Sequence, residues 1–503
     1  MKGSKYMDLI TAKKIKKEYT YWKWQINANE TFTEEMTIFT LTGKNVTYAL
    51  AALESGHLAH IYYGKRADDE DLSYLMRLNE NPFVPKVNER DMGTFMDTTP
   101  FEYPCHGIGD YREPAVSIMD EKGMTALDLR FVSYEMIDGK PELYQQLEDC
   151  TVRLPATFAA KDEAQTLAIT MKDAHSGLTA ILYYTVFADL NAITRSVKFI
   201  NGGDKAFKLT RALSACVDFD SDQYDFITLN GSWARERVME RCRLHHGKQS
   251  IDSVKGESSH QNNPFAALVS HNADEDMGEA YGFNLVYSGN FFAQAEVTQH
   301  KKTRFVMGIN HFDFSWKLEP AQEFTAPEVV MVYSDKGIGE MSRTFHDLYR
   351  QHIIRGEYKD KRRPILINNW EATYFNFNTE KLIDIAKQAS QLGIEMLVMD
   401  DGWFGHRNDD KSSLGDWFVN EDKIKGGLKH LVDEVNKIGL KFGIWFEPEM
   451  ISPDSKLYAE HQDWCIHIPG RHRTTVRSQL VLDFSRKEVR DYIYEQMKAI
   501  LSS

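Results

Sequence analysis

Residues suited to binding a sugar recur at four places in the C-terminal third of the sequence. They are Trp370, the pair Asp400-Asp401, Trp445 and Arg477. An indole stacks against the apolar CH face of a sugar ring, carboxylates accept hydrogen bonds from its hydroxyls, and a guanidinium donates hydrogen bonds to them. Side chains of these types in one pocket are typical of carbohydrate recognition.

Each of these residues also has a purely structural interpretation. The aspartate pair precedes Gly402, and an Asp-Gly pair after a strand commonly forms a turn. The two tryptophans are of a type that is mostly buried in protein cores. The arginine ends the basic stretch 471–477, which by itself is typical of a solvated loop. Spacing alone does not separate these interpretations from the functional one.

Alternating strands and helices surround the candidate residues. From Pro364 onward, β-branched runs alternate with amphipathic helical patterns, which is typical of parallel β/α units. The candidate residues follow the strand-like runs, at their carboxyl ends. The expected elements are, in order, strand 365–370, helix 380–392, strand 396–400, helix 427–438 and strand 440–446.

A fourth cycle is expected near the end of the sequence. Leu480–Asp483 reads as a further short strand, and Ser485 with Glu488 reads as a capping box for the helix that follows. Four such cycles, with polar and aromatic residues at the strand ends, predict the first half of a (β/α)8 TIM barrel.

The preceding part of the sequence has a different pattern. Between about residues 37 and 333, short β-branched and aromatic runs recur between turn residues without helical patterns, which predicts a large antiparallel β-sandwich. A helix at 336–363 is expected to link the two parts. The clearest strand-like runs are 131–136, 181–187, 193–200 and 329–333.

Composition excludes several classes of protein. A formal net charge of -14, from 74 acidic and 60 basic residues, argues against nucleic-acid binding. Five scattered cysteines form neither a disulfide framework nor a zinc-binding spacing, which favours a reducing cytoplasm, and the nearby His245, His246, His260 and Cys242 show no metal-ligand spacing. The first 21 residues lack a secretory apolar stretch, and no run of about 18 apolar residues indicates a membrane span.

Several longer motifs follow one another along the chain. In the C-terminal part they are ILINNWEATYF (365–375), MDDGWFG (399–405), SLGDW (413–417), GIWFEPEM (443–450) and LVLDFS (480–485). In the strand-rich part they are NGSWARER (230–237), SSHQNNPF (258–265) and YSGNFF (287–292). Together, over about residues 39–503, they resemble the bacterial α-galactosidases of glycoside hydrolase family 36.

The resemblance implies a fold and a mechanism. The fold is an N-terminal β-supersandwich followed by a (β/α)8 barrel, and the reaction is retaining hydrolysis through a galactosyl-enzyme ester, without a metal or organic cofactor. The implied nucleophile is the aspartate of a Lys-Trp-Asp motif on the next barrel strand, and the acid/base aspartate lies further on. Neither is expected before Ser503, so the sequence is interpreted as truncated before the nucleophile, and this chain alone is expected to be inactive.

The resemblance also assigns roles to particular residues. The aspartate pair would bind galactose hydroxyls, including the axial one, the tryptophans at 370 and 445 would form pocket walls, and the arginine would bind a hydroxyl. The tryptophan at 233 would reach the pocket rim from the supersandwich, while Glu447 and Glu449 would support the site. The implied substrate-binding residues are Asp400, Asp401, Arg477, Trp370, Trp445 and Trp233.

The expected organisation has four parts: an unmatched extension at 1–36, the supersandwich at 37–335, the linking helix at 336–363 and the incomplete barrel at 364–503. The expected substrate is a small α-1,6-galactoside such as melibiose or raffinose, and the family implies a homotetramer. Leu78-Asn79 do not match the acidic residue through which relatives reach a neighbouring subunit's pocket. Three functions stay open: α-galactosidase, a non-catalytic galactoside-binding or decayed fragment, and α-N-acetylgalactosaminidase or galactosyl transfer.

Overall fold

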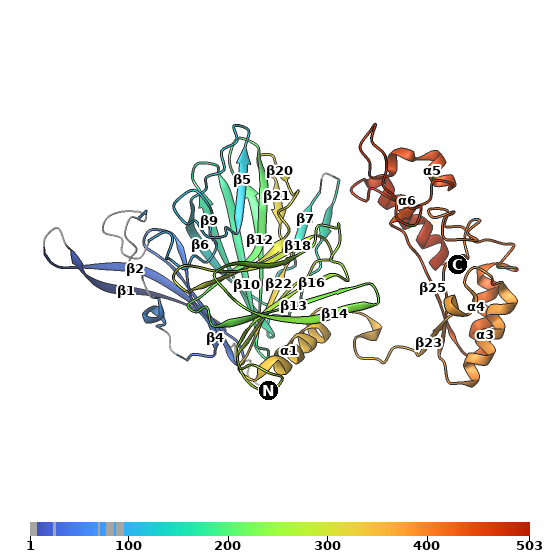
Figure 1. Ribbon diagram of the computed structural model, residues 1–503, viewed down its shortest axis with the longest axis horizontal. Helices are drawn as coiled ribbons and strands as arrows, with labels where there is room; N and C mark the ends of the chain where they lie inside the picture. The colour runs from blue at the N-terminus through green and yellow to red at the C-terminus, as the bar shows by residue number, and fades with distance from the viewer. Residues whose placement is uncertain (1–7, 24–26, 69–70, 77–84, 87–94, 148) are drawn as a thin grey trace. The chain divides into compact units, whose positions relative to one another are not determined.

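The protein folds into two compact units, Met1–Arg355 and Gly356–Ser503. The computed structural model describes the chain apart from residues 1–7, 24–26, 69–70, 77–84, 87–94 and 148 (Figure 1). Leu78-Asn79 and the first seven residues of the predicted extension therefore lie outside the described residues.

The N-terminal unit consists of antiparallel sheets, as the strand-like runs predicted. A ten-stranded sheet has the order β14-β13-β16-β17-β22-β11-β10-β9-β6, with β21 pairing to β11. Its strands are β6 (Leu129–Asp138), β9 (Ala164–Asp173), β10 (Leu178–Phe187), β11 (Ala192–Asn201), β13 (Tyr224–Ser232), β14 (Arg235–Arg243), β16 (Asn262–Ser270), β17 (Ala280–Leu285), β21 (Glu323–Thr325) and β22 (Val329–Ser334).

A second sheet lies against the first. Its order is β15-β18-β19-β12-β20, with β5 pairing to β12. Phe283 of the first sheet and Phe305 of the second stack with ring centroids 3.9 Å apart, so the two sheets share one core. The strands are β5 (Val116–Asp120), β12 (Phe207–Phe219), β15 (Gly247–Asp252), β18 (Phe291–Val297), β19 (Thr303–Ile309) and β20 (Trp316–Leu318).

A four-stranded sheet, β1-β2-β3-β4, includes the lysine-rich N-terminal region. Ile10 pairs with Leu41 and Lys16 with Glu35, so β1 and β2 form a long hairpin. The lysines at 14 and 16 are exposed, whereas Ile10 is buried and Ile15 is partly buried. The basic run is therefore mostly the solvent side of a strand. The strands are β1 (Ile10–Lys23), β2 (Ala28–Thr42), β3 (Val46–Ala52) and β4 (Leu58–Lys65).

One helix covers part of the N-terminal unit. Met341, Phe345 and Leu348 of α1 (Gly337–His352) are buried in one cluster with Val330 and Val332 of β22, so α1 packs on the ten-stranded sheet. The remaining elements of this unit are the 3-10 helix η1 (Ser73–Leu75) and the two-stranded sheet of β7 (Tyr144–Gln146) and β8 (Thr151–Arg153).

The C-terminal unit contains the predicted parallel sheet. Its order is β23-β24-β25, and helices α3 and α4 contact each other and share a core with the sheet. The unit comprises η2 (Glu357–Lys359), β23 (Leu366–Asn368), α2 (Trp370–Thr373), α3 (Thr379–Gln391), β24 (Met396–Met399), α4 (Gly427–Ile438), β25 (Lys441–Ile444), β26 (Met450–Ile451), α5 (Lys456–Glu460), η3 (Gln462–Trp464), β27 (Leu480–Val481) and α6 (Lys487–Leu501).

Two details predicted for the fourth cycle are wrong. β27 pairs antiparallel with β26, so within the described residues the parallel sheet has three strands. Ser485 does not cap α6, because its hydroxyl donates to Asp483 at 2.6 Å and the N-cap is Arg486. The first error arises because the pairing of β27 depends on residues about 30 positions away, and the second because Asp483, two residues before Ser485, takes its hydroxyl.

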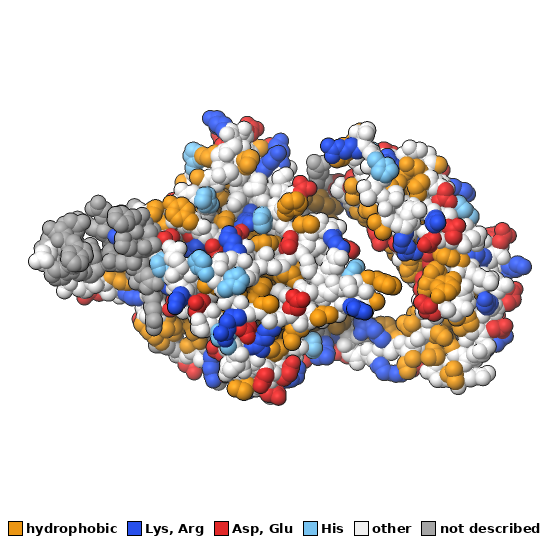
Figure 2. All heavy atoms as spheres, in the orientation of Figure 1, with side chains coloured by type: hydrophobic (Ala, Val, Ile, Leu, Met, Phe, Trp, Pro, Cys, Tyr) orange, Lys and Arg blue, Asp and Glu red, His pale blue; other side chains and the backbone are white. Residues whose placement is uncertain are grey.

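The surface carries charges of both signs. Figure 2 shows acidic and basic side chains interspersed over the face that it draws, without a continuous basic stripe among the residues that are described. No helix in the described part of the chain is long and apolar enough to cross a membrane.

Candidate active site

The carboxyl ends of the three parallel strands carry four of the five residues predicted in the C-terminal unit, all except Arg477. Trp370 follows β23, Asp400 follows β24, and Trp445 follows β25. The backbone N–H of Trp445 donates to the carbonyl of Met399 at 3.0 Å, which holds the last two strand ends side by side. Parallel strands expose their carboxyl ends at one edge, and that edge is where (β/α)8 enzymes carry their sites.

Asp400 is held by its neighbours on two sides. Asn368 donates from Nδ2 to Oδ2 of Asp400 at 2.5 Å, and the Asp401 N–H donates to Oδ1 at 2.7 Å. The Asp400 N–H in turn donates to Oδ1 of Asn369 at 2.8 Å. The Asp400 carboxylate is partly exposed, so it is fixed in place and still accessible to a ligand.

Asp401 forms a buried ion pair that sequence reasoning missed. Arg407 donates from Nε and Nη2 to the two carboxylate oxygens of Asp401, both at 2.8 Å, and from Nη1 to the carbonyl of Ser412 at 2.8 Å. The Arg407 side chain is fully buried and Asp401 is 4% exposed. Such a bidentate pair fixes a carboxylate in one plane. Nothing in the type or spacing of Arg407 distinguishes it from other arginines in the sequence.

The tryptophans of this unit fall into two groups. Trp403, Trp417 and Trp464 are buried in the core, whereas Trp370 and Trp445 are partly exposed. The Trp370 ring lies edge-on to Phe375, with centroids 5.0 Å apart. The two strand-end tryptophans therefore retain exposed surface, and their role as walls of a sugar pocket stays a prediction.

Glu447 is a further carboxylate near the predicted residues. Its Oε2 is buried without a hydrogen-bond partner among the described residues. Burial, and next the charge of Glu449, raises the pKa of Glu447, and the charge of Arg477 opposes this rise. Arg477 is exposed, in a left-handed backbone conformation with φ +52°.

Trp233 belongs to the N-terminal unit, unlike the other five predicted residues. It lies between β13 and β14 and is 83% exposed. An indole with so much exposed surface is unusual, because large apolar side chains are mostly covered. Its place in the substrate site stays a prediction.

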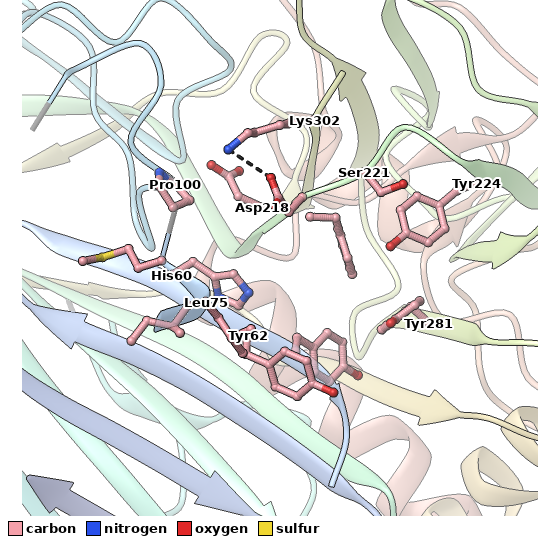
Figure 3. Close-up of a pocket in the computed structure, with 14 residues that line it drawn as sticks. His60, Tyr62, Leu75, Pro100, Asp218, Ser221, Tyr224, Tyr281 and Lys302 are labelled. Atoms are coloured by element: carbon pink, nitrogen blue, oxygen red, sulfur yellow. Dashed lines mark ion pairs between the residues drawn. The ribbon is translucent and has the colours of Figure 1, made fainter. Parts of the chain in front are cut away.

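A cavity of about 230 Å³ lies in the N-terminal unit, and none of the predicted residues lines it (Figure 3). Its lysine, aspartate and histidine side chains are paired within the protein: Lys302 with Asp220 at 3.0 Å, Asp218 with Arg304 at 2.8 Å, and His60 with Glu102 at 3.0 Å. The strand-end residues of the C-terminal unit are therefore the better candidates for the site.

The described residues contain no group of three or more His, Cys, Asp or Glu side chains that could hold a metal ion. The site in the C-terminal unit consists of fixed carboxylates and aromatic rings. Such an arrangement can bind and orient a neutral, hydroxyl-rich ligand.

Comparisons with known proteins define the family. Residues 56–319 match the Glycosyl hydrolase family 36 N-terminal domain, and residues 323–503 match the Melibiase domain. The chain therefore belongs to glycosyl hydrolase family 36, and it combines a β-rich N-terminal part with a TIM-barrel-type melibiase part.

Several α-galactosidases are similar to this chain. The α-galactosidase AgaA of Geobacillus stearothermophilus is 49% identical over 466 residues, which cover 92% of this chain and 63% of AgaA. Mel36A of Lactobacillus acidophilus is 44% identical, over 94% of this chain and 64% of Mel36A. A crystal structure of an AgaA variant with raffinose matches with a TM-score of 0.89 over 93% of this chain and 64% of AgaA. The chain thus spans about 63–64% of the length of these relatives.

Proposed function

We propose that this chain recognises the terminal galactose of α-galactosides and that the whole protein is a retaining α-galactosidase. The observation that carries the proposal is the fixed pair Asp400-Asp401 between two partly exposed indoles at the carboxyl ends of parallel strands. Raffinose is the ligand in the AgaA variant structure, which supports a small galacto-oligosaccharide as substrate.

The proposed roles follow from the chemistry of the side chains. The partly exposed Asp400 accepts hydrogen bonds from galactose hydroxyls, and Asp401, oriented by Arg407, presents its remaining lone pairs beside it. Trp370 and Trp445 stack on the apolar face of the ring, and Arg477 donates to a hydroxyl. These residues position the sugar, and they neither form nor break a bond.

The proposal assigns the covalent steps to residues outside this sequence. The Lys-Trp-Asp nucleophile motif that the family resemblance implies does not occur in it. This chain alone is therefore proposed to bind galactose without hydrolysing galactosides, and binding without turnover is also the second candidate function. We further propose a cytoplasmic homo-oligomer that requires no metal or organic cofactor.

Calorimetric titration of the purified chain with galactose and with glucose tests recognition. We expect tighter binding of galactose, and Asp400→Asn should weaken it about tenfold or more, because an amide replaces a charged acceptor. Asp384→Asn, at an exposed aspartate on α3, is the matched control. Equal affinity for the two sugars, or an Asp400→Asn variant that binds normally, would contradict the proposal.

Turnover is tested separately with an aryl α-galactoside. We expect no hydrolysis by the 503-residue chain and clear hydrolysis by a longer gene product that carries the Lys-Trp-Asp motif. Hydrolysis by the 503-residue chain at a rate comparable to its relatives would show that the proposed division of roles is wrong.

A further inference from the structure

Lys423 makes an unusual set of contacts beside the proposed site. It lies in the segment between β24 and α4 and is partly buried. Its ammonium donates three hydrogen bonds, to the backbone carbonyls of Phe375, Gly402 and Arg407, each at 3.0 Å. An ammonium has three donors, so all of them are used on main-chain oxygens.

The Lys423 ammonium loses hydration in this partly buried position, which disfavours its charged form. Burial lowers the pKa of Lys423, and the nearby charge of Asp401 partly opposes this effect. The carbonyl dipoles and the ring of Phe377, whose centroid lies 5.2 Å from Nζ, replace part of the lost hydration. Most lysine side chains are exposed to water. A partly buried lysine whose ammonium donates to three backbone carbonyls therefore has a specific structural role.

The three carbonyls belong to two different loops. Phe375 lies in the segment after β23, and its ring contacts the indole of Trp370. Gly402 and Arg407 lie in the segment after β24, where Arg407 holds Asp401. Lys423 therefore links the loop that carries the aromatic wall of the proposed site to the loop that carries its carboxylates, in addition to the hydrogen bonds between Asp400 and the two asparagines at 368 and 369.

The two loops approach each other closely at this point. Gly402 has φ +101°, and a Cβ added there would lie 2.9 Å from Cδ1 of Phe375. The Arg407 guanidinium also lies 5.8 Å from the centroid of the Phe375 ring. Three carbonyl oxygens that converge from such close loops repel one another unless a cation lies between them.

We propose that Lys423 is the positioning residue of the galactose site: its ammonium fixes the loop that carries Trp370 against the loop that carries Asp400 and Asp401. The inference rests on the proposed function for its ligand, but the loop arrangement itself does not. Lys423 does not contact the sugar in this scheme. It sets the distance between the stacking ring and the hydroxyl-binding carboxylates, and so the preference for galactose.

Three variants test the role in the full chain. Lys423→Met keeps most of the methylene stem and removes the donors, Lys423→Arg keeps the charge and offers donors in a different geometry, and Lys425→Met is a matched control at an exposed lysine of the same segment. Hydrogen exchange by mass spectrometry reports on peptides from 370–378 and 400–407, with α4 as the internal reference. Titration with galactose and glucose reports on the site.

We expect Lys423→Met to speed exchange about tenfold or more in both loops while exchange in α4 stays unchanged. Galactose affinity should fall about tenfold and the preference over glucose should narrow, with partial recovery in Lys423→Arg. A general loss of stability would instead raise exchange throughout the unit without changing the preference between the sugars.

The outcomes separate the two proposals. If Lys423→Met exchanges like wild type in both loops, or if exchange rises equally in α4, the positioning role is wrong. If wild type binds neither sugar, the proposed function fails for this chain, and the exchange experiment still decides whether Lys423 holds the loops together.

Discussion

The strands of the two units differ in how completely their own unit covers them. All six residues of β22 and all seven of β3 in the N-terminal unit are buried. In the C-terminal unit, Leu366 of β23 is 52% exposed and no residue of β25 is fully buried. β22 and β3 thus lie inside a closed core, whereas β23 and β25, the outer strands of the sheet that carries the candidate site, keep exposed surface.

Arg195 of the N-terminal unit and Arg407 of the C-terminal unit are both fully buried, and a comparison of the two shows the same contrast. Arg195 in the N-terminal unit pairs with Glu102 at 2.9 Å and also donates to the hydroxyls of Tyr48 and Tyr184, at 3.2 and 3.1 Å. Arg407 in the C-terminal unit donates hydrogen bonds to one carboxylate and one backbone carbonyl. Arg195 thus links several buried side chains of the core, whereas Arg407 orients one proposed binding residue, Asp401.

The largest expected effect is that of Arg195→Met. It leaves Glu102, which is 0% exposed, without the guanidinium of its buried ion pair, and breaking a buried pair typically costs about 3–5 kcal/mol. Urea unfolding followed by hydrogen exchange should show destabilisation in the N-terminal peptides and little change in peptides from 356–503. Equal destabilisation of both units would mean that they do not unfold separately.

Arg407→Met should have a smaller effect on stability but a larger one on binding. We expect a loss of about 3 kcal/mol confined to the C-terminal unit, because Asp401 is left buried and unpaired. Galactose binding should fall at least tenfold, because the carboxylate loses its fixed plane. Arg407→Lys is the control that retains the charge, and a variant with normal binding would show that Asp401 needs no such support.

The local pattern of the sequence was sufficient to predict much of the fold. The strand-like run 181–187 lies within β10, and 193–200 lies within β11. Helix 427–438 was predicted with its observed bounds, because its apolar face and Gly439, in the left-handed conformation, mark it locally. These features depend on neighbours within a few residues.

Features that depend on distant partners were not predictable in this way. The antiparallel pairing of Ile451 with Leu480 is set by tertiary contacts, and the sequence suggested a parallel strand there. Asp400 and Asp401 were found because they form part of a motif, whereas Arg407 and Lys423 act through backbone carbonyls and a buried pair that no residue type reveals. The sequence motif therefore proposed residues that would contact the sugar, whereas it gave no sign of Arg407 and Lys423, whose roles depend on tertiary contacts.

Two glutamates should give the units opposite responses to pH. Burial alone would raise the pKa of Glu113, but Arg211 and Lys248 lower it to about 2, below its ordinary value of 4.5. The N-terminal unit should therefore lose up to about 3 kcal/mol as pH falls from 4.5 to 2. The pKa of Glu447 is raised instead, so its ionisation disfavours the folded state. The C-terminal unit should therefore lose stability as pH rises above 4.5.

Substitution identifies these two contributions. Glu113→Gln should reduce the loss of stability of the N-terminal unit at acid pH, and Glu447→Gln should reduce the loss of stability of the C-terminal unit as pH rises, both measured by urea unfolding between pH 2 and 7. An unchanged slope in either variant would assign that pH dependence to other groups.

The smallest expected effect on stability is that of Trp233→Ala, at the 83% exposed indole of the N-terminal unit. A side chain with so few contacts should change the free energy of unfolding by less than about 0.5 kcal/mol. Trp316→Ala is the matched control, because the ring of Trp316 packs on Phe324 with centroids 5.1 Å apart and its loss should cost about 1–3 kcal/mol.

Sugar binding by the Trp233→Ala variant tests whether Trp233 belongs to the galactose site. If Trp233 forms the rim of the galactose site, its removal should weaken raffinose binding several-fold while galactose binding changes less, because a rim residue contacts the sugars beyond the terminal one. Equal raffinose affinity in wild type and Trp233→Ala would remove Trp233 from the site. The closed N-terminal unit would then serve as a scaffold, and all recognition would lie in the C-terminal unit.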